Sequence, residues 1–413
     1  MKLILGNGKT AQSIARFLDK QGIKFTLIED TRKTKGSAIL HGIDEIFISP
    51  GITQTDAIVT QARAQKIPVI SDIELFSRHA KAPIIGITGS NGKSTVTQLL
   101  GEMIANDGKK VAIGGNIGIP ALDCLNDEIE YYVLELSSYQ LDYTQNLTLL
   151  TGVVLNITPD HLDRYPSFED YAQSKLSLYK YCQYLVVNID EPLIPKQLHA
   201  KYFGIELPKK STDFGTVTCH DSCYVLKGDD SLTCIGDMQL IGEHNLKNAL
   251  AALALGDQIG LNINTMITTL KTFKGLEHRL EFVVKKDNIS YYNDSKATNS
   301  TSTITAIKAL IPTNQNIVLI MGGIKKQEDY TPLFTLINQH ITHTILISKD
   351  ATTFVKQITH TTHAQTLQEA VKIAESIINN GIILLSPACA SFDMFDNFEQ
   401  RGQVFKDAVG KIS

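Results

Sequence analysis

Short apolar runs alternate with amphipathic stretches along the first part of this 413-residue chain. The pattern predicts strands at 2–5, 25–28 and 45–49, and helices at 10–20 and 56–65. Strands that alternate with helices in this way are joined by right-handed crossovers into a parallel sheet. The first segment is therefore predicted to be an α/β layer.

The same alternation continues in two further segments that begin near Pro83 and Gly275. In the middle segment, strands are predicted at 84–88, 132–136, 153–156 and 185–188, and helices at 94–106 and 243–259. In the last segment, strands are predicted at 317–321, 344–347 and 382–385, and helices at 300–310, 367–379 and 398–409. Residues 200–240 contain short runs between turn residues and predict a small antiparallel annex. We therefore expect three α/β domains in series, at 1–81, 82–275 and 276–413.

Composition narrows the class of protein without identifying a function. Hydrophobic residues make up 43% of the chain, the net charge is −4 and the pI is about 6.3, which gives no support for nucleic acid or a membrane surface as partner. The N-terminus does not resemble a secretory signal, and no apolar run approaches the roughly 20 residues that span a bilayer. We expect a cytoplasmic protein with six free cysteines. The Cys219-His220-x-x-Cys223 fragment lacks the second ligand pair of a zinc site.

The strongest chemical signal is a glycine-rich turn between a predicted strand and a predicted helix, at 86–95 (GITGSNGKST). Backbone N–H groups at such a junction bind phosphate oxygens, Lys93 would neutralise them, and the Ser94 hydroxyl would ligate Mg²⁺. The spacing departs from the strict phosphate-loop pattern because Ile87 stands where glycine is usual. A plain glycine turn is the alternative, but Gly-Lys-Ser-Thr after a buried strand disfavours it.

Three weaker signals follow in the middle segment. Glu135 ends an apolar strand, where a carboxylate suits Mg²⁺, although a lone strand-end charge is more often solvated. Residues 156–164 are dense in His and Asp, which bind metal or phosphate or only cap turns. Lys175 shares a predicted helix face with Tyr171, a pattern that alone favours a surface lysine.

Polar segments also follow strands at both ends of the chain. At the C-terminal side these are 293–299, 321–326 and 386–392, whose cationic and hydroxyl groups suit an anionic small molecule. At the N-terminal side, residues 6–11 fit the dinucleotide fingerprint, with Glu29 and Asp30 about twenty residues further on. An NAD-dependent oxidoreductase is therefore one alternative function.

Taken together, these motifs resemble the Mur ligase superfamily and, within it, the enzymes that add D-glutamate. The stretches that carry the resemblance are 30–32, 72–76, 115–118, 135–141, 160–164, 242–245 and 386–402. The resemblance implies a Rossmann-like N-terminal domain that binds UDP, a central P-loop ATPase-like parallel sheet with a β annex, and a Rossmann-like C-terminal domain. It implies an ATP-dependent ligase that adds D-glutamate to UDP-N-acetylmuramoyl-L-alanine through an acyl phosphate, in peptidoglycan precursor synthesis.

The resemblance also implies residue roles. For ATP these are Gly89, Ser90, Asn91, Gly92, Lys93, Ser94, Thr95, Asn245, Asn248, Arg279 and Asp294. For the UDP substrate they are Thr10, Thr31, Arg32, Asn116 and Ser137, and for D-glutamate Lys296, Thr298, Lys326, Ser391 and Phe398. The catalytic set would be Lys93, Glu135, His161 and Lys175, and Mg²⁺ would be held by Ser94, Glu135, His161 and a CO₂-derived carbamate on Lys175.

Departures from the family pattern leave some of these roles open. Glu277 stands where proline is usual, Phe392 stands where leucine is usual, and Lys325 adjoins Lys326, so either lysine could meet the substrate. The motifs are also compatible with a sister Mur ligase, a folylpolyglutamate synthase, or a regulatory nucleotide-binding protein with a decayed site. We expect a monomer that acts on small-molecule substrates.

Overall fold

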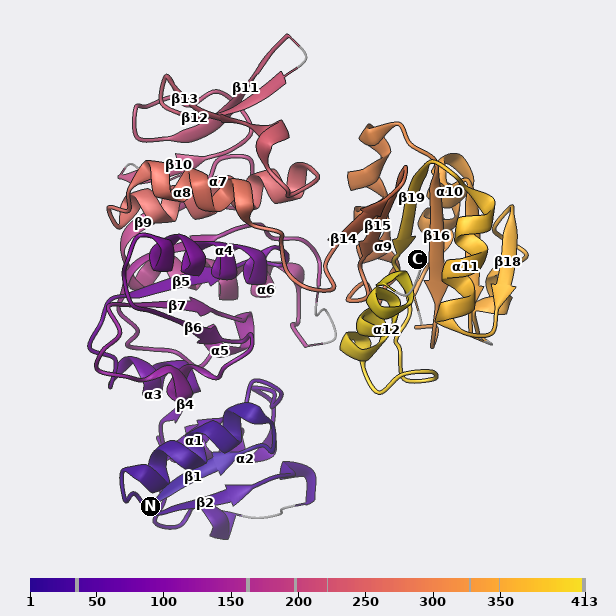
Figure 1. Ribbon diagram of the computed structural model, residues 1–413. Coiled ribbons are helices and arrows are strands. Elements are labelled where there is room, and N and C mark those ends of the chain that lie inside the picture. The colour runs from indigo at the N-terminus through magenta and orange to yellow at the C-terminus, as the bar shows by residue number, and fades with distance from the viewer. Residues whose placement is uncertain are drawn as a thin grey trace. The chain divides into compact units, whose positions relative to one another are not determined.

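The computed structural model describes residues 1–33, 37–160, 164–196, 199–220, 222–326, 328–348 and 350–410. The chain forms two compact units, one of Met1–Met238 with His244–Thr272 and the other of Gln239–Glu243 with Phe273–Ser413. Unit 1 holds two sheets and unit 2 holds a third (Figure 1). The predicted α/β class with three sheets in series is confirmed, whereas the three domain limits stay a prediction.

The first sheet is parallel, with strand order β2-β1-β3-β4. Its strands are β1 (Lys2–Leu5), β2 (Phe25–Ile28), β3 (Glu45–Ile48) and β4 (Val69–Ile70), and its helices are α1 (Lys9–Lys20) and α2 (Ala57–Ala64). Asp56 caps α2 by accepting a hydrogen bond from the N–H of Ile58. Because the strands are parallel, the turns after β1, β2 and β3 lie at one edge of the sheet.

The second sheet has nine strands in the order β13-β12-β11-β10-β9-β8-β5-β7-β6. They are β5 (Ile84–Thr88), β6 (Val111–Gly115), β7 (Tyr131–Glu135), β8 (Leu149–Val154), β9 (Cys182–Asn188), β10 (Ala200–Phe203), β11 (Phe214–Cys219), β12 (Ser222–Lys227) and β13 (Asp230–Cys234). The predicted antiparallel annex is only partly right. Strands β11, β12 and β13 pair antiparallel, but β10 pairs parallel with both β9 and β11, so the annex continues the central sheet.

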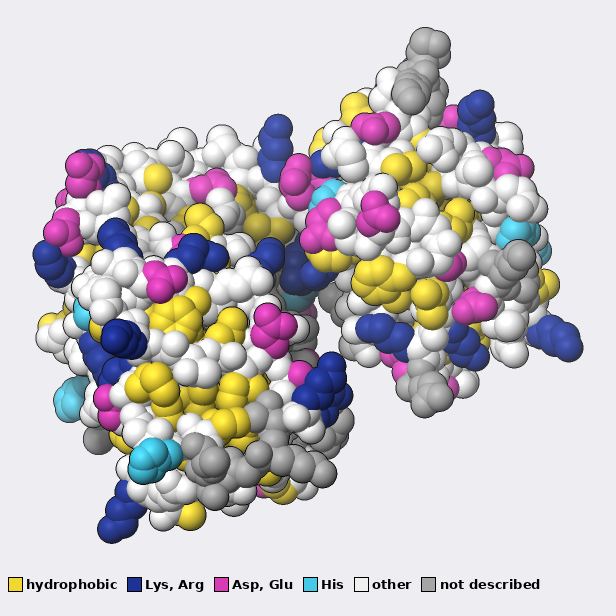
Figure 2. Space-filling view, turned by 90° about the horizontal axis from the view of Figure 1, so that it is seen from below, with side chains coloured by type: hydrophobic (Ala, Val, Ile, Leu, Met, Phe, Trp, Pro, Cys, Tyr) yellow, Lys and Arg dark blue, Asp and Glu magenta, His cyan; other side chains and the backbone are white. Residues whose placement is uncertain are grey.

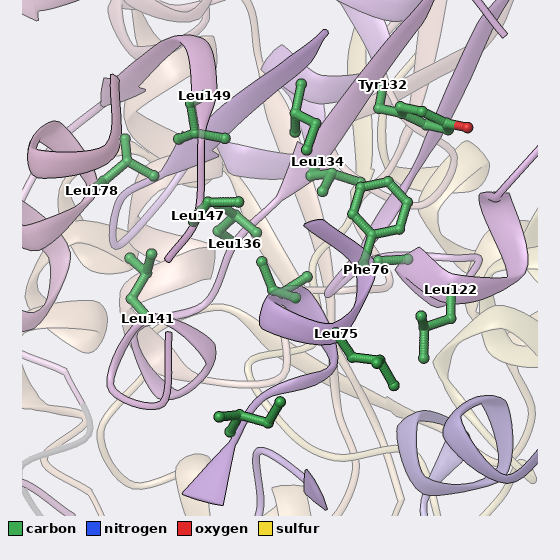
Figure 3. Close-up of a cluster of buried hydrophobic side chains, with 14 of the residues drawn as sticks. Leu75, Phe76, Leu122, Tyr132, Leu134, Leu136, Leu141, Leu147, Leu149 and Leu178 are labelled. Atoms are coloured by element: carbon green, nitrogen blue, oxygen red, sulfur yellow. The ribbon is translucent and has the colours of Figure 1, made fainter. Parts of the chain in front are cut away.

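The helices of unit 1 that matter for the site are α3 (Asp72–Ser77), α4 (Lys93–Asn106), α5 (Ser138–Leu141), α6 (Phe168–Leu176), α7 (Glu243–Gln258) and α8 (Ile263–Thr272). Short α3 follows the first sheet and inserts its apolar side chains into the core of the second. Figure 3 shows Leu75 and Phe76 of α3 among leucines from β7 and β8. Phe76 meets Tyr132 edge to face at 5.0 Å, so the two sheets of unit 1 share one core.

Unit 2 is built on a six-stranded sheet with the order β14-β15-β19-β16-β17-β18. Its strands are β14 (Glu281–Lys286), β15 (Ile289–Asn293), β16 (Ile317–Gly322), β17 (His343–Ile347), β18 (Thr361–Ala364) and β19 (Gly381–Leu385), and its helices are α9 (Ser300–Leu310), α10 (Thr331–His340), α11 (Leu367–Ile377) and α12 (Phe398–Gly410). Only β14 runs antiparallel to its neighbour. The loops after β15, β16 and β19 therefore emerge at the same edge.

The surface carries both signs of charge. On the face drawn in Figure 2, Lys and Arg side chains are interspersed with Asp and Glu. Within the described residues, none of the helices has the length and apolar character needed to cross a membrane.

Candidate functional site

The glycine-rich turn joins β5 to α4, as the sequence predicts, and is held in shape by its own lysine. The Lys93 ammonium group donates to the carbonyl oxygens of Gly89 at 2.8 Å and Ser90 at 3.0 Å. Gly92 directly precedes α4 with a φ of 83°, a conformation that glycine adopts without strain. The backbone N–H groups at the start of α4 and the Lys93 charge are the groups that bind phosphate in such loops.

A carboxylate from the neighbouring strand meets the start of α4. Glu135 ends β7, is 3% exposed, and accepts a hydrogen bond from the Ser94 hydroxyl at 2.7 Å. Its other oxygen accepts a hydrogen bond from the Asn116 amide at 2.9 Å. The structure thus brings together three side chains that the sequence analysis assigned to metal and substrate. Both donors are uncharged, so neither hydrogen bond pairs the carboxylate with an opposite charge.

Lys175 on α6 lies beside the same turn, so the surface location that the helix pattern alone favoured is wrong. Its side chain is 2% exposed, and its ammonium group donates to Gly89 O at 2.9 Å. Burial, and secondarily the charge of Lys93, lowers the Lys175 pKa from 10.5 to about 7. A large share of this amine is therefore neutral near pH 7, the form that reacts with electrophiles such as CO₂.

Residues around the turn fix it from the outside. The Ser90 hydroxyl lies 2.9 Å from the Tyr171 hydroxyl and donates to Thr158 O at 3.0 Å, while the N–H of Asn91 donates to the Asn156 side chain at 2.8 Å. Tyr171 also lies under the Lys175 ammonium group, 4.7 Å from ring centre to nitrogen. The sequence analysis did not assign these partners, and only the helical spacing of Tyr171 and Lys175 hinted at one of them.

The remaining predicted ATP contacts of unit 1 lie on or near this turn. Asn248 of α7 approaches Gly92 so closely that a Cβ at Gly92 would stand 2.2 Å from the side-chain amide oxygen, Oδ1, of Asn248. The Asn248 amide donates to the Asn245 side chain at 3.3 Å, and Thr95 follows Ser94 in the first turn of α4. Predicted residue His161 lies outside the described residues.

The donors at this site suit a hard cation. The Glu135 carboxylate and the Ser94 hydroxyl supply oxygen atoms, which Mg²⁺ prefers together with water and substrate phosphates. In the described part of the chain no group of three or more His, Cys, Asp or Glu side chains could hold a metal ion. Ser94 and Glu135 supply two oxygen donors, and Mg²⁺ commonly completes its coordination with water and substrate phosphates.

The predicted UDP contacts lie in three places in unit 1. Thr10 is in the first turn of α1, and Thr31 donates to the Asp56 carboxylate at 2.6 Å. Exposed Arg32 pairs with the Asp30 carboxylate, its Nε at 3.0 Å from an oxygen. The Ser137 hydroxyl caps α5 by accepting the N–H of residue 140 at 3.2 Å. Thr10, Thr31 and Arg32 follow β1 and β2 at one edge of the first sheet, and Ser137 lies between β7 of the second sheet and α5.

The first sheet also contains a residue that the sequence analysis missed. Ser49 follows β3, and its hydroxyl is buried and has no hydrogen-bond partner among the described residues. A Cβ on Gly6 would stand 2.4 Å from this hydroxyl oxygen. A buried, unsatisfied hydroxyl next to a glycine turn is a candidate ligand contact. The only signal in the sequence was its position directly before the Pro50-Gly51 turn.

The predicted D-glutamate residues lie at one sheet edge of unit 2. Lys296 and Thr298 follow β15, Lys326 follows β16, and Ser391 follows β19. The Lys296 ammonium group lies 3.7 Å from the centre of the Phe398 ring, at the start of α12. Both lysines of the ambiguous pair are exposed, and the ammonium group of Lys325 lies 5.8 Å from the Tyr330 ring centre.

Asp294, predicted to contact the nucleotide, is buried in this structure. Its carboxylate accepts hydrogen bonds from the N–H of Leu280 at 3.1 Å and from the Ser386 hydroxyl at 2.7 Å. Burial raises the Asp294 pKa to about 7, although the nearby Arg279 charge opposes the shift. Arg279 directly precedes Leu280, so the two predicted residues are neighbours in the fold.

Comparisons with known proteins identify the family of this chain. Residues 87–256 match the Mur ligase middle domain, and residues 278–389 match the Mur ligase glutamate ligase domain. The chain is 39% identical to a UDP-N-acetylmuramoylalanine--D-glutamate ligase of Pseudomonas syringae, over 100% of this chain and 98% of the relative. It is also 39% identical to the ligase of the same name from Acinetobacter baylyi, with the same shares covered.

Solved structures share the fold at much lower identity. MurF from Acinetobacter baumannii superposes with a TM-score of 0.65 at 18% identity, covering 97% of this chain and 99% of that one. UDP-N-acetylmuramate-alanine ligase MurC from Thermotoga maritima gives 0.62 at 17% identity, covering 100% and 99%. The full-length similarity to the D-glutamate ligases distinguishes this chain from the other Mur ligases. The chain belongs to the UDP-N-acetylmuramoylalanine--D-glutamate ligase family of Mur ligases.

Proposed function

We propose that this protein is a cytoplasmic, ATP- and Mg²⁺-dependent ligase that joins D-glutamate to UDP-N-acetylmuramoyl-L-alanine. The observation that carries the proposal is the convergence of Lys93, Ser94, Glu135 and Lys175 on the turn between β5 and α4. This arrangement combines a phosphate-binding loop with a metal-binding carboxylate and a reactive amine. The relatives' printed name supplies the two organic substrates.

The first chemical step would activate the carboxylate of the UDP substrate. A carboxylate oxygen attacks the γ-phosphorus of ATP, an O–P bond forms, the bond to ADP breaks, and an acyl phosphate results. Lys93 and the N–H groups at the start of α4 would offset the negative charge that gathers on the phosphate oxygens. Activation is needed because a free carboxylate is a poor acyl donor.

Mg²⁺ and a carbamate on Lys175 would supply the other charges that the reaction needs at this site. Ser94 and Glu135 would hold Mg²⁺, which when bound neutralises phosphate oxygens, and His161 is a further proposed ligand. The neutral Lys175 amine would attack CO₂, form an N–C bond and lose a proton, which gives an anionic carbamate. Its pKa of about 7 supports this step, because most of the amine is neutral above that pH.

The second step would form the amide bond. The ammonium group of D-glutamate loses a proton, and the resulting amine attacks the acyl carbon; the C–O bond to phosphate then breaks, inorganic phosphate leaves, and the nitrogen loses a second proton to give the amide. Lys296, Lys326 and the hydroxyl groups of Thr298 and Ser391 would bind the carboxylates of the amino acid. Their positions after parallel strands of unit 2 support this role.

ADP release measured with UDP-N-acetylmuramoyl-L-alanine tests the proposal directly. Release should require D-glutamate and should fail with L-alanine, meso-diaminopimelate or L-glutamate, which separates this activity from sister ligases and folylpolyglutamate synthases. Lys93→Ala should abolish turnover, whereas Lys109→Ala, just beyond α4, should not. Turnover that persists in Lys93→Ala, or that proceeds equally with another amino acid, would reject the proposal.

The carbamate has its own test. Lys175→Ala should lose activity and regain part of it with added acetate, a short carboxylate that can occupy the space of the carbamate. Lys180→Ala, an exposed lysine five residues further on, is the matched control and should behave like the original protein. Full activity of Lys175→Ala without acetate would exclude a role for a carbamate.

A further inference from the structure

Arg401 of α12 is a fully buried cation that the proposed reaction leaves without a role. It is 0% exposed and heads the largest fully buried side chains of the protein. Burial lowers its pKa from 12.5 to about 10, so the guanidinium group stays charged at neutral pH. Its four hydrogen bonds are accepted by three carbonyl oxygens and one hydroxyl group, all uncharged. The Asp393 and Asp294 carboxylates act on this charge, but neither accepts one of these four hydrogen bonds. Burying a charge is costly, so the uncharged groups that Arg401 does bond are of interest.

The acceptors belong to three loops that are distant in sequence. These strand-end loops are residues 294–299 after β15, 322–326 at the end of β16, and 386–392 after β19. Arg401 donates to Ser295 O at 2.8 Å and to Ser295 Oγ at 3.0 Å in the first loop. It donates to Gly322 O at 3.5 Å in the second and to Cys389 O at 3.1 Å in the third. One planar side chain therefore bridges all three loops.

Further contacts tie the same loops to α12. The Ser295 hydroxyl donates to Phe398 O at 2.8 Å, which fixes the start of α12, and the Phe398 ring lies against the Lys296 ammonium group. The second and third loops are also joined by a two-residue bridge in which Ile324 and Ala390 exchange backbone hydrogen bonds at 2.9 and 3.0 Å. The three loops that carry the proposed amino-acid contacts are thus connected to one another, to Arg401 and to the start of α12.

We propose that Arg401 is a positioning residue of the amino-acid subsite. Its bonds fix the positions of the three strand-end loops relative to one another, so that side chains from all three can contact one amino acid that carries two carboxylates. This inference rests on the proposed function for the identity of that amino acid. The guanidinium group presents its N–H donors from three nitrogens spread over a fixed plane, whereas the three N–H donors of lysine leave a single atom at the end of a flexible stem, so lysine cannot hold the same acceptors in the same planar arrangement. The buried charge also adds attraction for the carboxylates that the loops would bind.

The test compares Arg401→Lys, which keeps the charge and loses the planar arrangement of donors, with Lys286→Met. Lys286 donates to Val409 O at the opposite end of α12, so this control loosens the same helix without touching the loops. For Arg401→Lys, the KM for D-glutamate should rise about tenfold or more, while the KM values for MgATP and the UDP substrate change less than about twofold. Amide hydrogen exchange should accelerate in all three loops together. Lys286→Met should lower only the melting temperature.

Several outcomes would overturn the proposal. An unchanged KM for D-glutamate in folded Arg401→Lys would do so, as would equal increases in all three KM values, which indicate a general loss of structure. If Arg401→Lys does not fold, Ser295→Ala, which removes one acceptor, should give a smaller shift in the same direction, and no shift refutes the idea. If the original protein does not use D-glutamate, the proposed function fails, and hydrogen exchange in the three loops still decides the role of Arg401.

Discussion

Replacing Lys175 by methionine should stabilise the protein near neutral pH even though it should destroy activity. The folded protein lowers the pKa of this amine from 10.5 to about 7, chiefly by burial. Between these two pH values the unfolded chain binds a proton at Lys175 and the folded protein does not. Stability is therefore lost as pH falls through this window, and the loss is complete below about pH 7.

The size of the effect follows from the same values. A pKa lowered from 10.5 to about 7 corresponds to a penalty of roughly 5 kcal/mol once both states are protonated. Methionine removes this penalty, fills a similar volume, and gives up the hydrogen bond to Gly89 O, worth about 1–2 kcal/mol. Gly89 O keeps Lys93 as a donor, so no buried acceptor is left unsatisfied. We expect a net gain of about 2–3 kcal/mol at pH 7 that shrinks to near zero by about pH 9.

Urea unfolding at several pH values measures this difference. The protein is kept in CO₂-depleted buffer, so that Lys175 carries no carbamate, and Lys180→Met serves as the exposed control with no pH-dependent difference. If Lys175→Met were less stable than the original protein at pH 7, or if the difference did not change between pH 7 and 9, the buried neutral amine would be refuted.

Two further substitutions test the glycine-rich turn and the buried carboxylate of Glu74. Gly92→Ala should weaken MgATP binding in calorimetry more than tenfold, by roughly 1.4 kcal/mol or more, because the φ of Gly92 is 83° and the added Cβ would meet Asn248. The control is Gly108→Ala, which should bind MgATP normally because Gly108 has a similar φ of 80° but open space around it. Glu74→Gln should lower the urea-measured stability at pH 7 by about 2–3 kcal/mol, because this buried carboxylate accepts three N–H groups from residues 145 and 146. Burial acts to raise the Glu74 pKa, but those hydrogen bonds outweigh it and lower the pKa. The difference in stability between the two proteins should therefore shrink as pH falls below about 4.5. A stability difference that stays constant with pH would contradict this account.

The sequence predicted most of the strands and the centre of the site, for identifiable reasons. The strands Lys2–Leu5 and Ile84–Thr88 were predicted to the residue, because each is a short apolar run that ends at a glycine turn. The contact between Ser94 and Glu135 follows from parallel strands whose ends share an edge. Lys175 needed the family resemblance, because its helix pattern alone favoured an exposed side chain.

Other features depended on contacts that no local pattern contains. A strand was predicted at 153–156, but β8 begins at Leu149 and contains Gly152. Glycine is needed within the strand because a Cβ there would stand 2.7 Å from Cys182 Sγ and 3.0 Å from Gly86 O. The bonds of Arg401 likewise reach acceptors up to 106 residues away along the sequence. Spacing along the chain cannot reveal such pairings.

The carbonyl oxygen of Gly89 accepts hydrogen bonds from both Lys93 and Lys175, so a single acceptor holds two ammonium groups close together. Their like charges repel, and any ligand that engages Lys93 changes the proton affinity of Lys175. Thermodynamic linkage then requires the reverse effect with the same coupling free energy. Nucleotide affinity must consequently vary with pH around the Lys175 midpoint, and that midpoint must move when the nucleotide binds.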